Sequence, residues 1–229
     1  MSSLTLARAG RFILDAVYPP SCALCGRAGV FLCATCEASL PRADGKRCPR
    51  CWLPLHQPHC DPEPAFAALR SRYRYVDDVR KLVHRLKFSR LSSLAEPLGT
   101  LLAELVIDEG GVADALVPVP LRTMGERERG YNQAALLAKQ AAKVLGIPVI
   151  EPLQRRGAAT VQAKTKSAEQ RRLNVEGAFS LRKGHDVAGM SLLLVDDVAT
   201  TGATLDACAR ALLDAGAVAV SAVTLARED

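Results

Sequence analysis

The chain has 229 residues, 49% of them hydrophobic and 24% charged, and a formal net charge of +6. It is long enough to bury a full core, and its charge permits a nucleic-acid partner without requiring one. No apolar run is long enough to span a membrane, and Arg8, Arg11 and Asp15 interrupt the opening segment, which argues against a signal peptide. We therefore expect a cytoplasmic protein that is not an integral membrane protein.

The amino-terminal segment is rich in cysteine. Three CxxC pairs and one further cysteine lie close together: Cys22 and Cys25, Cys33 and Cys36, Cys48 and Cys51, and Cys60. In a reducing compartment this density favours zinc held by thiolates over a disulfide framework or a redox motif. We expect one or two zinc sites, each structural, because four protein ligands leave no open position for water.

The first two CxxC pairs are sufficient for one site with four cysteines. The third pair needs two more ligands, and Cys60 is one of them. His56 or His59 supplies the other, and we prefer His56 because neighbouring residues rarely both reach one ion. An interleaved site, in which the first and third pairs share a metal, is the alternative.

A proline-containing linker follows the cysteine-rich segment. The residues from Asp61 to Phe66 read DPEPAF, which is typical of a linker. We place a boundary at Pro64, with an amino-terminal helix and a double zinc-binding module in residues 1–64. Residues 65–229 then form the main domain.

The main domain is expected to begin with a strand over residues 68–76 and a helix that starts at Asp77 or Asp78. This helix has an apolar stripe and the most basic surface of the chain. A solvated helix face explains the basic residues, and contact with nucleic-acid phosphates is the alternative. The candidates for nucleic-acid binding are Lys81, Arg85, Lys87 and Arg90.

Apolar strands and helical segments then alternate. We expect helices over residues 93–106 and 132–145, and strands over residues 114–121, 147–150, 178–181 and 217–225. Alternation of this kind predicts an α/β fold with a parallel, doubly wound sheet and helices on both faces. Arg129, Tyr131, Asn132 and Gln133 lie where the second of these helices begins, and each is a candidate either for ligand contact or for helix initiation.

A short apolar strand over residues 191–195 is followed by two acids and a threonine-rich turn into a helix. Asp196 and Asp197 come at the carboxyl end of the strand, where open parallel sheets bind their ligands. The turn Thr200–Thr204 brings unpaired N–H groups and hydroxyls to a helix start, which suits a phosphate. Adjacent carboxylates suit a diol or a metal ion, so the pattern indicates a ribose phosphate. A capped helix with two solvated acids is the simpler alternative.

The sequence VDDVATTGAT resembles the phosphoribosyl pyrophosphate (PRPP) motif of type I phosphoribosyltransferases. By this resemblance Asp196 and Asp197 hold the ribose hydroxyls, and the following turn wraps the 5′-phosphate with Mg²⁺ accompanying PRPP. The residues assigned to PRPP are Asp196, Asp197, Ala199, Thr200, Thr201, Gly202, Ala203 and Thr204.

Several spaced motifs together resemble the ComF family: VPVPL, RERGYNQAALLA, RRLNVEGAF and VDDVATTGAT behind the CxxC pairs. The resemblance implies a type I phosphoribosyltransferase-like sheet preceded by a zinc finger, and a loop over residues 155–174. It also implies that Pro120 and Arg122 face the pyrophosphate. Cations that close over the leaving group would aid transfer, and the candidate catalytic residues on the loop are Lys164, Lys166 and Arg171.

ComF proteins are linked to the uptake of single-stranded DNA during natural transformation, so the resemblance implies single-stranded DNA, a competence helicase or a membrane DNA channel as partners. Two other functions remain open. The chain is either a nucleobase salvage phosphoribosyltransferase or a non-catalytic PRPP-sensing adaptor. The sequence leaves open whether turnover occurs and which acceptor is used.

Overall fold

The computed structural model describes residues 20–55, 60, 63–88, 92–121, 130–155 and 177–229. The chain divides into two compact units, Met1–Leu40 and Pro41–Asp229. The third CxxC pair packs within the second unit, and the boundary at Pro64 stays a prediction. There the Leu69 N–H donates to the Arg50 carbonyl at 2.7 Å, and the Trp52 indole N–H donates to the Ser71 carbonyl at 3.1 Å.

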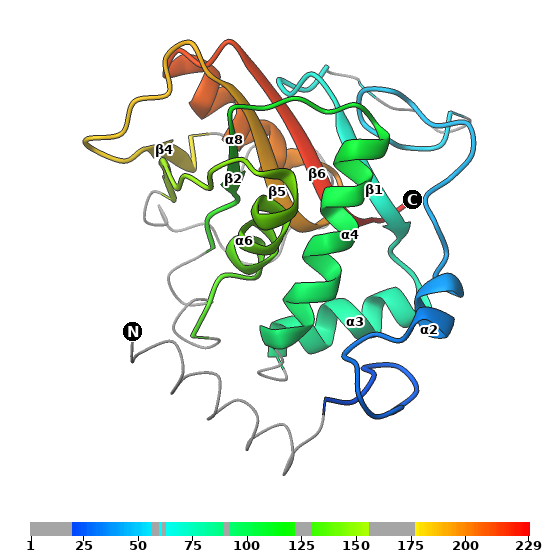
Figure 1. Ribbon diagram of the computed structural model, residues 1–229. Helices are drawn as coiled ribbons and strands as arrows, with labels where there is room; N and C mark the ends of the chain where they lie inside the picture. Colours follow the sequence, from blue (N-terminus) through cyan, green and yellow to red (C-terminus); the bar gives the residue numbers. More distant parts are fainter. Residues whose placement is uncertain (1–19, 56–59, 61–62, 89–91, 122–129, 156–176) are drawn as a thin grey trace, which may run out of the picture. The chain divides into compact units, whose positions relative to one another are not determined.

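A parallel sheet forms the centre of the second unit. Its four strands lie in the order β1-β6-β5-β2 (Figure 1). Their bounds are Leu69–Arg74 for β1, Ala115–Pro118 for β2, Ser191–Ala199 for β5 and Ala219–Arg227 for β6. In this register Val195 of β5 lies between Pro118 and Val223. All four strands therefore end at one edge of the sheet, as the alternation of elements predicts.

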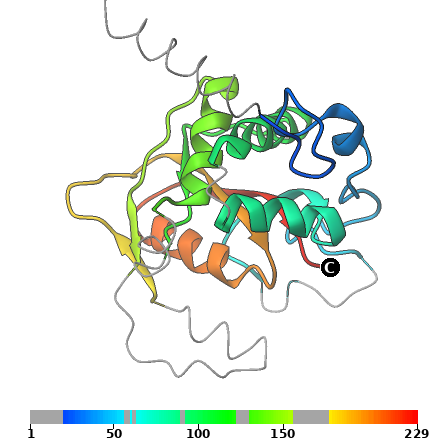
Figure 2. The same ribbon diagram turned by 90° about the horizontal axis from the view of Figure 1, so that it is seen from below.

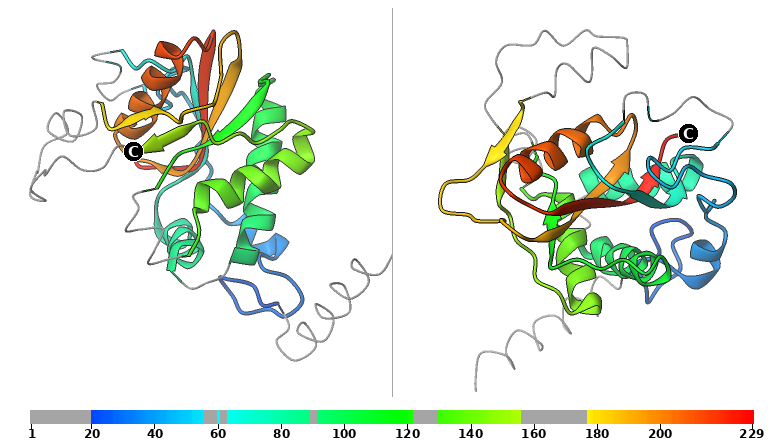
Figure 3. Two further views of the ribbon diagram at one scale, coloured as in Figure 1. Left: turned by 90° about the vertical axis from the view of Figure 1, so that its left-hand side faces the viewer. Right: turned by 90° about the horizontal axis from the view of Figure 1, so that it is seen from above.

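Helices cover both faces of this sheet, which confirms the expected fold class. In the described part of the unit these helices are α3 (Asp77–Phe88), α4 (Ala95–Asp108, after the 3₁₀ turn η1, Ser92–Leu94), α6 (Gln133–Leu145) and α8 (Ala203–Asp214). Helices α4 and α6 pack side by side on one face, and α8 lies on the other (Figures 2 and 3). Within its described residues, the amino-terminal unit contains the short helix α2 (Ala34–Ala38).

The core beneath α8 is aliphatic. Leu205 and Leu212 of α8 are buried against Leu192, Leu194 and Val220 of the two central strands. On the other face Leu98 and Leu102 of α4 and Leu137 of α6 are fully buried. The stretches at helical spacing in the sequence thus place their apolar stripes against the sheet. Among the described residues, no helix combines the length and apolarity needed to cross a membrane.

Three strands differ from their predicted form. Strand β5 continues to Ala199 instead of ending at Val195, because β6 is equally long and pairs with it as far as Arg227. The segment expected as a strand over residues 147–150 forms only an isolated bridge between Val149 and Leu116, since Pro148 has no N–H to donate. Strand β4 (Phe179–Leu181) pairs antiparallel with β3 (Leu153–Arg155) in a separate two-stranded sheet.

The close approach of α4 and α6 depends on a glycine. A Cβ atom at Gly99 would lie 2.5 Å from the Gln140 Cβ atom and 2.8 Å from the Leu137 carbonyl oxygen. We expect Gly99→Ala to lower the free energy of unfolding by about 1–3 kcal/mol through overpacking, although alanine has the higher helix propensity. Urea unfolding measures this change. Thr100→Ala, at the next and partly exposed position, is the control; equal stability of the two variants would show that the helices do not require this close contact.

Candidate functional site

The first two CxxC pairs form one cluster. The Sγ atoms of Cys22, Cys25, Cys33 and Cys36 all lie within 4.8 Å of one another, and those of Cys25 and Cys33 are 3.7 Å apart. Four sulfur atoms at about 2.3 Å from a zinc ion have spacings of roughly 3.8 Å. The cluster therefore fits a structural zinc site. The interleaved alternative is wrong for this arrangement, because the first pair meets the second and not the third.

Backbone N–H groups prepare this cluster to bind a cation. The Cys33 N–H donates to the Cys22 Sγ atom at 3.5 Å. Desolvation opposes ionisation of Cys22, but backbone hydrogen bonds from Cys25, Cys33 and Leu24 outweigh it and lower the pKa of this thiol to about 6. Because the thiolate is the form that ligates zinc, the local backbone favours metal binding.

The third CxxC pair forms a second cluster with Cys60. The Sγ atoms of Cys48, Cys51 and Cys60 lie within 4.8 Å of one another, with Cys48 and Cys60 at 3.5 Å. Despite desolvation, backbone hydrogen bonds from Cys51 and Arg50 lower the pKa of Cys48 to about 7. These three thiols fit a zinc site that takes one more ligand. His56 and His59, the two candidates for that ligand, lie outside the described residues.

The two acids lie at the carboxyl edge of the sheet, within β5. Asp196 and Asp197 are neighbours in the strand, and their carboxyl groups interact with each other. Asp197 is 6% exposed and Asp196 is half-buried. Desolvation of its carboxyl group and the adjacent charge of Asp197 raise the pKa of Asp196 to about 8. Asp196 is thus mainly protonated at neutral pH, and a cation bound beside it would favour its ionised form.

Lys87 contacts this acid pair directly. Its Nζ atom is 2.8 Å from the Asp197 Oδ2 atom, and its side chain is 23% exposed. The Tyr131 hydroxyl donates to the Leu86 carbonyl at 2.6 Å, which ties the end of α3 to the residues before α6. The role of Lys87 was missed in the sequence, although the signal was present: Lys87 follows the buried Val83 by four residues and so falls on the buried stripe of the helix.

The other candidates for nucleic-acid binding have different surroundings. Lys81 is exposed and pairs with Asp78 at 2.7 Å, and Arg85 is exposed on the same helix. Arg90 lies outside the described residues. The basic face of α3 therefore comprises Lys81 and Arg85 among the described candidates, while Lys87 faces the acid pair.

The turn after β5 leads into α8 without a side-chain cap. Thr200 and Thr201 are exposed, and Gly202 adopts φ of 80°, a left-handed conformation that glycine tolerates best. The Ala203 N–H donates to the Thr201 hydroxyl at 3.3 Å, and the first helical bond runs from the Asp206 N–H to the Gly202 carbonyl at 2.9 Å. A helix start of this kind presents N–H groups and the positive end of the dipole to an anion.

A cavity of about 150 Å³ lies at the same edge of the sheet, where β2 ends. Its lining includes Pro120, Asn132, Arg155 and Arg182. Asn132 donates to the Val119 carbonyl and accepts from the Ala134 N–H, both at 3.0 Å, so it caps α6 and fixes the loop after β2. Arg122, Lys164, Lys166, Arg171 and Arg129 lie outside the described residues, so their predicted contacts stay predictions.

The raised pKa of Asp196 makes stability depend on pH. The folded protein keeps this proton up to about pH 8, whereas the unfolded chain releases it near pH 4, so the contribution is lost as pH rises through this window. We expect Asp196→Asn to raise the free energy of unfolding by at least about 1.4 kcal/mol more at pH 8.5 than at pH 6, the equivalent of one pKa unit. Urea unfolding at both pH values, with the exposed Asp214→Asn as control, measures the difference. A gain that is equal at both pH values would contradict the assigned protonation.

Comparison with known proteins identifies both parts of the chain. A family model described as phosphoribosyl transferase domain matches residues 131–229, and one described as double zinc ribbon domain matches residues 13–65. The DNA utilization protein YhgH of Escherichia coli is 32% identical over 207 residues, which cover 86% of this chain and 90% of that protein.

Two relatives bear competence names. Competence protein F of Haemophilus influenzae is 30% identical, with 86% of this chain and 90% of that protein covered. Competence protein ComFC of Bacillus subtilis is 34% identical, with 86% and 84% covered. The chain therefore belongs to the ComF family of competence and DNA utilization proteins, with an amino-terminal double zinc ribbon and a phosphoribosyltransferase-type domain.

Proposed function

We propose that this protein binds PRPP with Mg²⁺ at the carboxyl edge of its sheet and acts in the cytoplasm in the uptake or handling of single-stranded DNA. The observation that carries the first half is the placement of a desolvated acid pair beside an uncapped helix start. The acid pair suits a diol and the helix start suits a phosphate, and a ribose phosphate contains both groups.

The described residues divide the binding task between them. The N–H groups and hydroxyls of the turn Thr200–Thr204 would hold the 5′-phosphate. Carboxylate oxygens of Asp196 and Asp197 would accept hydrogen bonds from the ribose hydroxyls, and such hard oxygen donors also suit Mg²⁺. The Lys87 Nζ atom lies 2.8 Å from the Asp197 Oδ2 atom, so this ion pair fixes the position of the Asp197 carboxyl group beside the ligand.

The nucleic-acid half of the proposal draws on the printed names of the relatives and on the charge of the chain. Those relatives are named for competence and DNA utilization, and this chain carries a net charge of +6. The exposed Lys81 and Arg85 of α3 offer a surface for phosphates. A competence helicase or a membrane DNA channel would be the partner that delivers or removes the strand.

Thermal unfolding with Mg²⁺ and PRPP tests the ligand. A ligand that binds only the folded state stabilises it by about 2.7 kcal/mol at one hundred times its dissociation constant. We expect this shift in the native protein and in Asp214→Asn, but not in the Asp196→Asn, Asp197→Asn double variant. A native protein without any shift, while zinc content is normal, would refute PRPP binding.

The fate of bound PRPP separates the two other functions. Release of pyrophosphate only when a particular base is added would establish a salvage enzyme. Binding without consumption across a panel of bases would establish an adaptor that senses PRPP.

Affinity for single-stranded DNA tests the nucleic-acid half. We expect binding that weakens steeply as salt rises, because each phosphate contact releases a counterion. The Lys81→Gln, Arg85→Gln double variant should bind more weakly and show a salt slope reduced by roughly 1.4, about 0.7 per lost contact on single strands. Lys139→Gln, Lys143→Gln on α6 is the charge-matched control. Fluorescence anisotropy across a salt series measures both, and equal slopes for the two variants would exclude the α3 face.

A further inference from the structure

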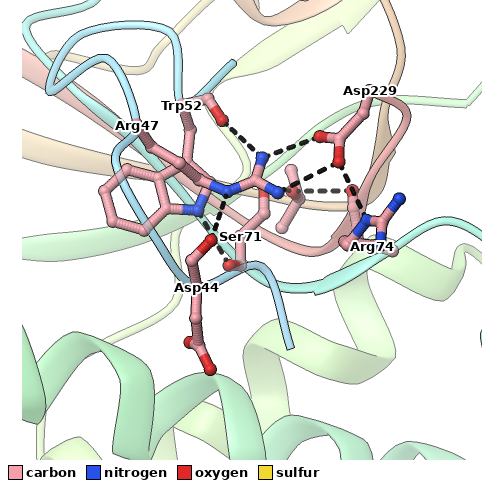
Figure 4. Close-up of polar contacts among 8 residues, drawn as sticks. Asp44, Arg47, Trp52, Ser71, Arg74 and Asp229 are labelled. Atoms are coloured by element: carbon pink, nitrogen blue, oxygen red, sulfur yellow. Dashed lines mark hydrogen bonds and ion pairs between the residues drawn. The ribbon is translucent and has the colours of Figure 1, made fainter. Parts of the chain in front are cut away.

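The second cysteine cluster is fixed to the end of the central sheet. Arg47, whose side chain is 4% exposed, donates to both carboxylate oxygens of Asp229 at 2.7 and 3.0 Å (Figure 4). The same guanidinium donates to the Trp52 carbonyl at 2.9 Å, and the Trp52 indole N–H donates to the Ser71 carbonyl of β1. The loop that carries Cys48 and Cys51 is therefore held against β1 and the end of β6.

Arg227, the last residue of β6, is a buried cation two positions before Asp229, the residue to which Arg47 ties the loop. It is 1% exposed, and its Nε and Nη1 atoms have no hydrogen-bond partner among the described residues. An uncompensated guanidinium in such a place is strongly unfavourable. Desolvation and the charge of Arg47 lower the pKa of Arg227, and the charge of Asp229 and the thiol groups of Cys51 and Cys60 oppose this shift.

Two negative groups could balance the charge of Arg227, namely Asp229 and the second cysteine cluster, and the cluster is the better candidate. Asp229 already accepts hydrogen bonds from Arg47 and from Arg74, whose Nε atom is 3.0 Å from its Oδ2 atom. Three thiolates around one zinc ion leave a net charge of about −1 when the fourth ligand is neutral. A loaded cluster thus supplies the negative charge that the buried guanidinium lacks.

The guanidinium of Arg227 also lies close to the turn Thr200–Thr204, which we call the phosphate turn. Its Nη1 atom is 3.9 Å from the position that a Cβ atom of Gly202 would occupy, and the Phe66 ring is at 3.8 Å from the same point. The backbone of Arg227 pairs with Ala199, and the Glu228 N–H donates to the Ala199 carbonyl at 2.9 Å. The guanidinium therefore lies behind the turn that begins at Thr200.

We propose that Arg227 is a positioning residue shared by the second zinc ribbon and the phosphate turn: the thiolate charge of the ribbon holds its guanidinium behind Gly202, and the guanidinium orders the turn for a phosphate. The proposal rests on the proposed function in assigning the turn to a phosphate. It makes zinc occupancy of the second cluster and phosphate affinity thermodynamically linked, although no zinc ligand touches the turn. The second ribbon is then part of the binding site as well as a fold element.

Variants of Arg227 test the link from both sides. Arg227→Met removes the charge, Arg227→Lys keeps it, and Arg210→Met on the exposed face of α8 is the control. We expect Arg227→Met to weaken ribose 5-phosphate binding at least tenfold by calorimetry, and to speed the release of one of two zinc ions to a chromophoric chelator. Arg227→Lys should recover part of both properties, which a purely steric role would not explain.

Cysteine variants provide a second, independent test. We expect Cys60→Ser in the second cluster to increase amide hydrogen exchange in residues 200–204 and to weaken ribose 5-phosphate binding. Cys25→Ser in the first cluster should lose zinc without either effect. Unchanged exchange of the turn in both Cys60→Ser and Arg227→Met would overturn the proposal.

The exchange measurement needs no ligand, so it separates the two hypotheses. A native protein that binds neither PRPP nor ribose 5-phosphate, but whose turn loosens in Cys60→Ser and Arg227→Met, would refute the proposed ligand and uphold the link. Binding by the native protein that persists undiminished in both variants would refute the link and uphold the ligand.

Discussion

The pairing of β5 with β6 over their full length is the constraint on which the candidate site depends. Because the two strands stay in register to Ala199 and Arg227, the acid pair is held within a rigid strand and not on a loop. The same pairing brings the start of the turn beside the buried guanidinium of Arg227. One run of backbone hydrogen bonds therefore sets the positions of the acid pair, the turn Thr200–Thr204 and the guanidinium relative to one another.

Burial then gives these groups their chemistry. Asp196 is an ordinary carboxylic acid by type, but desolvation and the charge of Asp197 raise its pKa to about 8. Asp197 forms an ion pair with Lys87, whose Nζ atom lies 2.8 Å from the Asp197 Oδ2 atom. A cation or a hydrogen-bond donor that enters the site would favour the ionised form of Asp196, so its binding is linked to release of the Asp196 proton.

The two zinc ribbons lie in different structural units. The first cluster lies in the compact unit Met1–Leu40, whereas the second lies in the unit that carries the sheet. Sequence alone predicts one module with both zinc sites, the first with two CxxC pairs and the second with one CxxC pair and Cys60. The contacts of Arg47 and Trp52 with β1 and Asp229 give the second ribbon a structural connection to the proposed binding site.

Local sequence determined the parts of this protein that depend on near neighbours. The CxxC pairs, the turn from Thr200 to Thr204 and the amphipathic helices are set by residues a few positions apart, so the zinc clusters, the helix start and the α/β class were predictable. Tertiary structure alone decided the length of β5, the bridge that replaces a strand at Val149, and the meeting of Lys87 with Asp197. Each of these depends on a partner far away in the chain, and no local pattern encodes which distant strand or side chain will supply the missing hydrogen bond or charge.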